Sequence, residues 1–450
     1  MSEEIIMLHW IFFFITILVL AFLMLRKPVG LIPLLVIAVA LEISSAWYPE
    51  LGTVGKILSP LSLTRFTSLA LIGALILRFI LYREIRIKCF TILKDPLTLV
   101  LLLYLALGAV SLSYSAAPRE TAIEVLRLVV LFGVFLAIAT LVDRKQVLYP
   151  FKALLGMALV LAPFAFYEVA RGKLLWLQAT EVGRGIIRAK VTFIDPNILA
   201  RYLILGIIAA FILQYYTREK GKRYFYFGAQ IVLLVELFLT NSRGGFITLA
   251  IVLLAVLIIL PRRRRALAIL GICVLGCALV LLLRPEMMER MLSLTQGLEA
   301  SNPQRFYLWQ AALAIFKDHI VLGTGLGTFQ TVFLTDYIHL KTVADGATLS
   351  HTTVLTIASE LGILGLGVLA LIWGVLLAKL LVLFRTGNDY LGMFNDSRNA
   401  YLAGAGYFLW ILAIFISSQG EGRFFEDPLF WLSSACLLAL KLRSETLSLN

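Results

Sequence analysis

One arginine in a short turn between two apolar blocks is the first residue that could do phosphate chemistry. Arg243 lies in TNSRGG, where the apolar blocks leave few polar residues for a connection. A guanidinium group offers five N–H donors in a planar fork, which suits phosphate oxygens. Gly244 and Gly245 would let other backbone approach closely. Arg243 is therefore a candidate for a fixed phosphate contact, and snorkelling to a lipid phosphate is the alternative.

Two further arginines stand beside segments whose patterns predict helices. Arg305 begins the amphipathic stretch RFYLWQAALAIF (305–316), and Arg188 precedes KVTFIDPN. In the latter, Asp195 and Pro196 predict a helix start. We expect both arginines near the same anionic ligand as the turn arginine. The alternative for each is a solvated charge at a helix end.

His351 is the residue best placed for proton transfer. It stands where the longest loop meets the apolar block 352–384. An imidazole, with an ordinary pKa of about 6.5, suits a general base, and an interfacial helix cap is the alternative. Glu360 would lie half a turn out of phase and about 13 Å deeper on a straight helix. We therefore expect Glu360 to contact a neighbouring helix and not to orient His351.

The composition requires a membrane setting for these residues. Of the 450 residues, 60% are hydrophobic, against about 45–50% in soluble domains. The apolar runs are long and unbroken, whereas barrel strands alternate, and a spanning helix needs about 20 such residues. The sequence predicts an all-α polytopic membrane protein with about 12–13 transmembrane helices. The apolar blocks are 5–25, 29–47, 66–82, 97–114, 120–141, 150–170, 197–216, 224–240, 244–260, 266–283, 352–384, 399–418 and 428–442.

The net charge of +13 follows the topology and does not indicate nucleic acid. Lys and Arg cluster after every second block, and such clusters mark cytoplasmic loops and contacts with anionic membrane lipids. The C-terminus is then expected in the cytoplasm, and the N-terminus outside if all thirteen blocks span. The strongest clusters are Arg83, Arg86, Lys88 and Lys94; Arg144, Lys145 and Lys152; Arg218, Lys220, Lys222 and Arg223; and Arg262 to Arg265.

The same topology divides the chain into three parts. Residues 1–283 hold about ten transmembrane helices, residues 284–351 form a large outer loop, and residues 352–450 hold the last helices. At roughly 68 residues the loop is too long for a simple connector, and we expect a small helical subdomain on the outer face. Ten cations fall on or near this disfavoured side, and a shared anionic ligand would account for them: Arg184, Arg188, Lys190, Arg201, Arg243, Arg284, Arg290, Arg305, Lys317 and Lys341.

Other motifs exclude several kinds of site. The segment GTGLGTF (323–329) follows no strand, so a dinucleotide site is not expected. Its glycines should form tight turns, with phosphate-binding amides as the alternative. There is no C-x-x-C, H-E-x-x-H or Walker pattern, and the acids of EGRFFEDP (421–428) are weak candidates for a divalent ion. We therefore expect neither a metal nor a cofactor, with arginines holding the phosphate in place of a metal.

Four stretches together resemble the O-antigen ligase and polymerase superfamily. The chain departs from the family pattern at Val191, where Gly is usual, and at Thr352, where Asn is common. The first 180 residues match only in hydropathy. The stretches are RAKVTFIDPNILA (188–200), TNSRGGFITL (240–249), RFYLWQAALAIFKDHIVLGTGLGTF (305–329) and HTTVLTIASELGILGLG (351–367).

The resemblance implies a GT-C-like glycosyltransferase of the bacterial inner membrane, active at the periplasmic face. Its donor would be an undecaprenyl-pyrophosphate-linked glycan, and its acceptor the lipid A core or another glycan. The family's functional residues fall on Arg243, Arg305 and, as a further contact, Arg188 for the pyrophosphate, and on His351 for the acceptor. The reaction would be metal-independent and inverting.

The sequence leaves other functions open. A glycan polymerase and a protein O-oligosaccharyltransferase differ from a ligase in the acceptor alone, and the pattern around His351 favours the ligase slightly. A lipid-linked glycan flippase would need charges along a continuous inner cavity. If the protein were a purely structural membrane subunit, the outer arginines would have no functional explanation.

Overall fold

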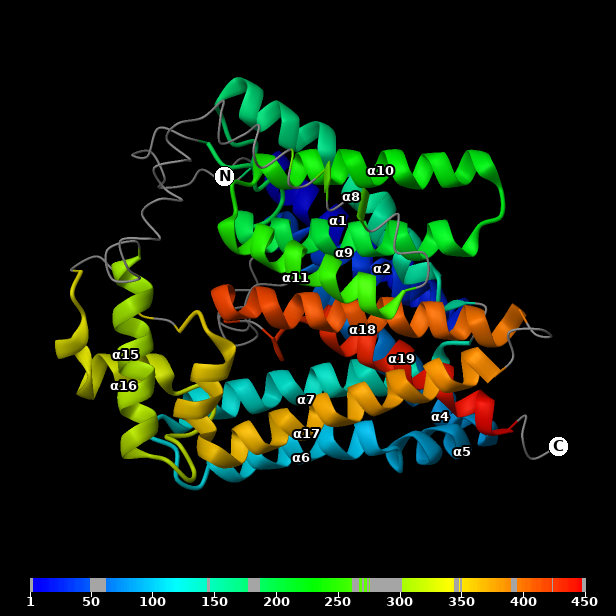
Figure 1. Ribbon diagram of the computed structural model, residues 1–450. Helices are drawn as coiled ribbons and strands as arrows, with labels where there is room; N and C mark the ends of the chain where they lie inside the picture. The colour runs from blue at the N-terminus through cyan, green and yellow to red at the C-terminus, as the bar shows by residue number, and fades with distance from the viewer. Residues whose placement is uncertain are drawn as a thin grey trace.

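The computed structural model is helical, and its described residues contain no strand (Figure 1). It describes residues 3–48, 62–143, 146–176, 187–260, 302–343, 350–389, 395–422 and 424–446, with a few single residues between them. The main helices are α1 (Glu3–Arg26), α2 (Leu31–Ala40), α4 (Leu63–Leu81), α5 (Arg83–Leu93), α6 (Pro96–Ser111), α7 (Pro118–Leu141), α8 (Tyr149–Arg171), α9 (Pro196–Tyr216), α10 (Lys220–Leu239), α11 (Arg243–Ile259), α15 (Pro303–Asp318), α16 (Phe329–Asp336), α17 (Thr353–Asp389), α18 (Asn395–Glu421) and α19 (Pro428–Thr446).

Four of these helices begin with an acid or amide followed by proline. The side-chain oxygen accepts a hydrogen bond from a backbone N–H of the first turn, and proline at the next position needs no N–H partner. The expected start at Asp195–Pro196 is confirmed, because Asp195 accepts from the Asn197 amide at 2.6 Å. The other three starts are Asp95–Pro96 for α6, Asn302–Pro303 for α15 and Asp427–Pro428 for α19.

The predicted class, an all-helical polytopic membrane protein, is confirmed, but the candidate spans are fewer than the expected 12–13. Within the described residues, seven helices are long and apolar enough to cross a membrane, or eight if α5 and α6, bent by 72°, count as one span. Three apolar helices are shorter: Pro28–Ala40, Arg243–Ile259 and Pro428–Leu440. An apolar block therefore predicts a helix better than it predicts a full span. The block 266–283 lies outside the continuously described ranges.

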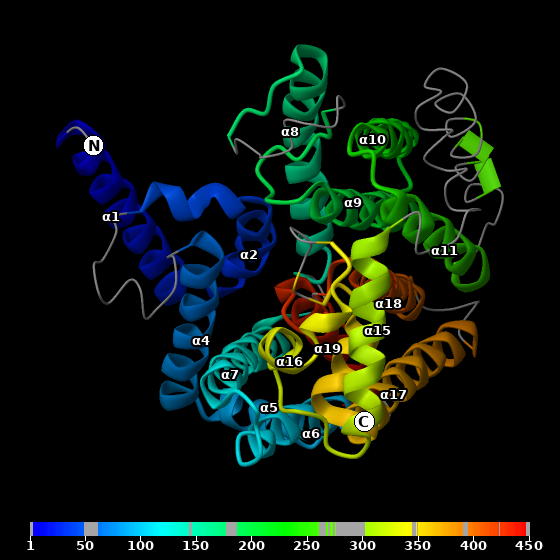
Figure 2. The same cartoon turned by 90° about the vertical axis from the view of Figure 1, so that its left-hand side faces the viewer.

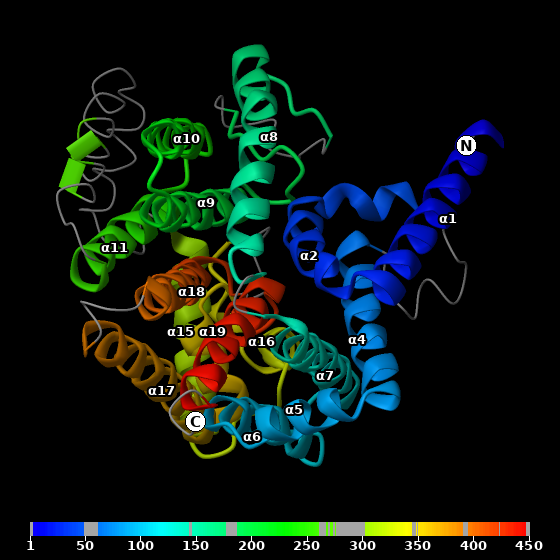
Figure 3. The same ribbon diagram turned by 90° about the vertical axis from the view of Figure 1, so that its right-hand side faces the viewer.

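Three helices form the centre of the bundle. The apolar window of α9 is 100% buried and that of α18 is 83% buried, whereas α1 is only 6% buried. Figures 2 and 3 show α9, α18 and α19 surrounded by the other helices. Large apolar side chains are exposed along α1, α4, α10 and α17. A soluble monomer rarely exposes so much contiguous apolar surface, so these outward faces fit a lipid environment.

A short helical layer crosses one end of the bundle, which we call the α15 end. There α15 runs across the ends of the bundle helices, with α16 beside it (Figures 1 and 2). The two share a small apolar cluster of their own, which includes Tyr307, Ile315 and Phe333. The described part of the loop 284–351 is thus largely helical, as the sequence suggested, whereas its first part, 284–301, and with it Arg284 and Arg290, lies outside the described residues, as does Arg184.

At the opposite end of the bundle a buried ion pair joins α6 to α17. Lys379 Nζ lies 2.7 Å from Asp95 Oδ2, and both side chains are at most 5% exposed. The other oxygen of Asp95 accepts from the Leu97 amide at 2.8 Å and so caps α6. One carboxylate therefore fixes both the start of α6 and its contact with α17.

We predict that Lys379→Met destabilises the protein by about 3–5 kcal/mol, because it leaves Asp95 buried without its cation. The double variant Asp95→Asn, Lys379→Met keeps a capping oxygen and removes both charges, so it should recover most of that loss. Thermal unfolding of detergent-purified protein measures both. Equal destabilisation of the single and double variants would contradict the ion-pair account.

Candidate functional site

The turn between α10 and α11 places Arg243 at the α15 end as the first residue of α11. Ser242 caps α11 by accepting from the Gly245 amide at 3.1 Å, and its hydroxyl donates to Asn197 Oδ1 of α9 at 2.7 Å. A side chain at Gly245 would meet the Ala200 Cβ at 2.9 Å, so this glycine does permit a close approach, whereas the space around Gly244 is open. Arg243 is half-buried on a turn fixed to α9.

Arg188 supports this turn directly. Its Nε donates to the Thr240 carbonyl at 3.0 Å, and its Nη2 donates to Asn197 Oδ1 at 3.1 Å. Asn197 therefore receives hydrogen bonds from both Arg188 and Ser242. The two predicted phosphate residues Arg188 and Arg243 belong to one hydrogen-bonded group at the starts of α9 and α11.

The segment after Arg188 contains a strained backbone position. Val191 has φ of +49°, a region in which a β-branched residue is an outlier. The buried Glu168 carboxylate holds it there by accepting from the Lys190 and Val191 amides at 3.1 and 3.0 Å. This is the position at which the resembling family usually has Gly, and the left-handed backbone gives the physical reason.

A buried ion group that the sequence did not reveal lies beneath the site. Arg201 Nη1 is 2.8 Å from Glu421 Oε2, and its Nη2 is 3.1 Å from Asp427 Oδ2; all three side chains are at most 8% exposed. The expectation that Arg201 serves an anionic ligand is therefore not supported, because two internal carboxylates already face it. The signal in the sequence was an arginine inside the apolar block 197–216, which needs an acidic partner, and the acids of 421–428 were candidates for it.

Arg305 reaches the last turn of α18. Its Nη2 donates to the Gly420 carbonyl at 3.0 Å. Partial burial lowers the pKa of the Arg305 guanidinium below its ordinary value, and the nearby Asp195 and Glu421 carboxylates oppose this shift. Asp195 is the residue that caps α9, so Arg305 is within reach of the charge at the start of that helix.

His351 is half-buried and lies between residues tied to the same end of α18. Thr352 Oγ1 accepts from Trp309 Nε1 at 2.6 Å and donates to the Gln419 carbonyl at 3.3 Å. A Cβ on Gly422 would lie 3.3 Å from the His351 Cα, so the two backbones are in contact. Thr352, which stands where Asn is common, thus positions the segment that carries His351.

The four residues predicted from sequence therefore lie at one end of the bundle, in two groups. Arg188 and Arg243 share Asn197, and Arg305 and His351 share the end of α18. All four are partly exposed. The arrangement offers guanidinium donors and one imidazole on the same face.

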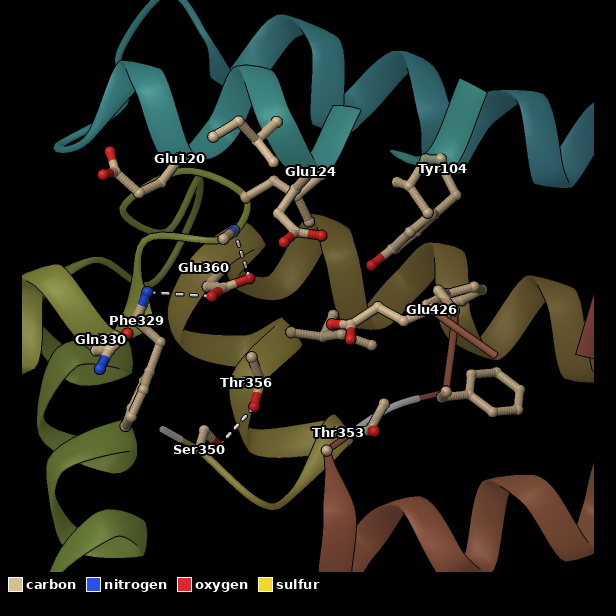
Figure 4. A pocket seen from close by; sticks show the side chains of 18 residues that line it. Tyr104, Glu120, Glu124, Phe329, Gln330, Ser350, Thr353, Thr356, Glu360 and Glu426 are labelled. Atoms are coloured by element: carbon tan, nitrogen blue, oxygen red, sulfur yellow. Dashed lines mark hydrogen bonds between the residues drawn. The ribbon is translucent and has the colours of Figure 1, made fainter. Parts of the chain in front are cut away.

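The glycine-rich loop before α16 is held by Glu360. Helix α17 is broken at Gly362, with φ of +62°, which leaves the preceding carbonyls open. The Thr324 and Gly325 amides donate to the carbonyls of Ser359 and Glu360 at 3.1 and 2.9 Å. The Glu360 carboxylate then accepts from the amides of Gly327 and Phe329 at 2.8 and 3.1 Å (Figure 4). Glu360 thus contacts both this loop and, as expected, a neighbouring helix, because Phe329 is the first residue of α16.

The loop amides cannot serve as a phosphate cradle in this structure. Each amide from Gly323 to Phe329 already donates within the protein, to His319 O, Ser359 O, Glu360 O, Ser111 Oγ, Glu360 Oε2, Gly325 O and Glu360 Oε1 in turn. The alternative of phosphate-binding amides is therefore wrong, and the expectation of tight turns is confirmed by positive φ at Gly323, Gly325 and Gly327.

Beside the loop lies a cavity of about 340 Å³ that the sequence did not predict (Figure 4). Its wall includes Tyr104, Glu124, Glu426 and Glu360. Ser350 and Gly422, which adjoin His351, also line the cavity. In the part of the chain that the structure describes, no group of three or more His, Cys, Asp or Glu is arranged to hold a metal ion.

Residues 228–370 match the family model described as O-antigen ligase, Wzy_C. These residues form an O-antigen ligase domain. The match includes Arg243, Arg305 and His351, whereas Arg188 precedes it. No curated protein matches the chain. The protein is thus a membrane protein with a Wzy_C O-antigen ligase domain, and the Wzy_C family, a family of glycosyltransferases of the O-antigen ligase or polymerase type, implies lipid-linked glycan substrates.

We predict that Val191→Gly raises the free energy of unfolding by about 1 kcal/mol, because Gly removes the cost of a left-handed β-branched residue. Thermal unfolding in detergent measures the change. Val191→Ala keeps a Cβ at the same φ and should gain less. A destabilised Val191→Gly protein would contradict the strain.

We also predict that Gly323→Ala sharply lowers the yield of folded protein. The added Cβ would lie 2.2 Å from the Glu360 backbone, at a φ of +68°. Gly367→Ala is the matched control in α17, where the space is open, and Ala should be neutral or stabilising there. Size-exclusion profiles and melting temperatures compare the two, and equal behaviour would contradict the docking of the loop on α17.

Proposed function

We propose that the protein transfers a glycan from an undecaprenyl-pyrophosphate carrier to an acceptor hydroxyl, at the periplasmic face of the bacterial inner membrane. The observation that supports this most is the gathering of Arg188, Arg243, Arg305 and His351 at the α15 end. The family match supports the reaction class. The lysine and arginine clusters of the other loops support the orientation.

In this mechanism the arginines hold the donor's diphosphate. Arg243 and Arg305 stabilise the charge that develops as the bond between the anomeric carbon and the phosphate oxygen breaks. Charge-assisted hydrogen bonds contribute about 1.5–3 kcal/mol each. Arg188 contributes a further contact and also fixes the turn of Arg243, because it bonds Thr240 and Asn197. These cations carry the positive charge that a metal supplies in other transferases, so the reaction proceeds without a metal.

His351 acts as the general base. It takes the proton from the acceptor hydroxyl as the oxygen attacks the anomeric carbon, and the leaving undecaprenyl pyrophosphate departs from the opposite face. The new glycosidic bond therefore has inverted configuration. The hydrogen bonds of Thr352 to Trp309 and Gln419 restrict the segment that carries His351, which favours a fixed base over a mobile surface imidazole.

A ligase acting on the lipid A core is favoured slightly over a glycan polymerase or a protein O-oligosaccharyltransferase, because the pattern around His351 resembles ligases. A lipid-linked glycan flippase is less well supported. Such a protein needs cations along a passage through the bundle, whereas the four site residues lie at one end.

We predict that Arg243→Ala and Arg305→Ala each lower transfer about 10²–10³-fold, and that His351→Ala lowers it about 10²–10⁴-fold. The assay uses purified protein in nanodiscs, an undecaprenyl-pyrophosphate-linked glycan and acceptor lipid, with and without EDTA. Arg119→Ala, an exposed arginine in the first turn of α7, is the matched control and should retain full activity. Full activity in the three site variants, or loss of wild-type activity in EDTA, would remove this mechanism.

A further inference from the structure

The cavity beside the glycine-rich loop is lined by a phenol hydroxyl to which no described residue hydrogen-bonds. Tyr104 of α6 is 3% exposed, and its hydroxyl makes no hydrogen bond to the described residues. Its ring stacks on Phe425 with the centroids 3.9 Å apart, and the hydroxyl points into the cavity (Figure 4). The phenol hydroxyl therefore opens onto the cavity, where it can hydrogen-bond to an occupant.

Two carboxylates face the same space. The side chains of Glu124 and Glu426 point toward the Tyr104 hydroxyl, whereas the carboxylate of Glu120 turns away (Figure 4). Arg127 Nη1 donates to both oxygens of Glu124, at 2.8 and 2.9 Å, and lies 3.6 Å from Glu426 Oε2. One guanidinium thus orients two acids, and their remaining acceptor sites face the cavity.

The lining fits a hydroxyl-rich ring better than a cation. The acids of the described residues are not arranged as a metal site. The wall also carries the aromatic rings of Phe329, Phe424 and Phe425, and about 340 Å³ lies at the small end of ligand pockets. Carboxylates and a phenol hydrogen-bond to hydroxyl groups, and aromatic faces pack on apolar ring surfaces. This set of groups is suited to one end of a glycan.

We propose that this cavity binds the terminal sugar of the acceptor, and that the sugar is uncharged or carries an amine. Glu124 and Glu426 accept from its hydroxyl or ammonium groups, and Tyr104 makes the third polar contact. The same carboxylates repel acceptors that carry a carboxylate or phosphate at this position. The assignment to the acceptor rests on the proposed glycosyl transfer.

The position of the cavity suits this assignment. Ser350 and Gly422 line it, and His351 lies directly beside both in chain or in space. A sugar held there is adjacent to the segment that carries the base. The loop residues Leu326 and Gly327 form another wall, and a Cβ on Gly327 would meet Glu124 at 2.5 Å. Because Glu360 holds this loop by its hydrogen bonds, it also shapes the cavity.

The test is a binding measurement on the full chain in nanodiscs, on an array of neutral, amino-sugar, uronic-acid and phosphorylated glycans. We expect the wild-type protein to bind only glycans with uncharged or amino termini. In the double variant Glu124→Gln, Glu426→Gln that binding should fall about tenfold, while binding of uronic-acid glycans appears. Tyr104→Phe should weaken the binding of neutral glycans about fivefold and should not allow anionic glycans to bind.

Glu120→Gln is the matched control, because this acid belongs to the same wall but its carboxylate points away from the cavity. The Glu120→Gln protein should bind the glycans as the wild-type protein does. Opposite changes for neutral and anionic glycans cannot arise from partial unfolding, and melting temperatures check the fold of each variant. Binding that is absent, mainly to anionic glycans, or unaffected by the double variant overturns the proposal. So does a thermal shift by Mg²⁺ or Ca²⁺ that requires Glu124 and Glu426.

The binding and transfer measurements separate the two proposals. Arg243→Ala should lower transfer about 10²–10³-fold and leave binding on the array unchanged, since this arginine binds the donor. If transfer persists in the arginine and His351 variants while the cavity variants change binding, the mechanism fails and the glycan site stands. If the arginine variants lose transfer and the cavity variants bind as wild type does, the site proposal alone fails.

Discussion

The carbonyl end of α18 is the feature on which the candidate site depends. The last carbonyls of a helix have no intrahelical partner and carry partial negative charge. Here three side chains from the first turn of α15 and the start of α17 bond to successive carbonyls: Thr353 to Ser418, Thr352 to Gln419 and Arg305 to Gly420. These bonds join the starts of α15 and α17 at one point. His351, one residue before Thr352, is therefore positioned by the end of a helix more than sixty residues later in the chain.

The buried charges below that point set the electrostatics of the site. Glu421 ends α18 and Asp427 follows it closely, and both would repel a diphosphate if they stood alone. Arg201 neutralises part of their charge from inside the bundle, at 2.8 and 3.1 Å. A buried ion pair is weak evidence for stability, so its clearest effect is on the local field. Because Arg201 pairs with these acids, the half-buried Arg305 is only weakly influenced by Glu421. Its positive charge therefore remains available to a ligand.

The sequence predicted the features that depend on local pattern. The helix start at Asp195, the tight turn that holds Arg243 and the helical residues after Arg305 each follow from a few neighbouring residues. The pairing of Arg201 with Glu421 joins positions more than two hundred residues apart, and no local pattern contains that partner. The cavity around Tyr104 is assembled from five separate segments and was missed for the same reason. Glu360 was placed on a straight helix, whereas α17 is broken two residues later at Gly362, and the loop that the Glu360 carboxylate binds docks at this break.

The two proposed subsites carry opposite charge, and this difference directs the donor and the acceptor to different subsites. The guanidinium groups of Arg243 and Arg305 favour the anionic end of the donor, whereas Glu124 and Glu426 disfavour it. A diphosphate would therefore be excluded from the acid-lined cavity even though both spaces adjoin the same segment around His351. A neutral sugar has no such barrier to the cavity and little attraction to the arginines. Selection by charge would thus orient donor and acceptor before His351 acts, which is an entropic contribution to the rate that the base alone cannot supply.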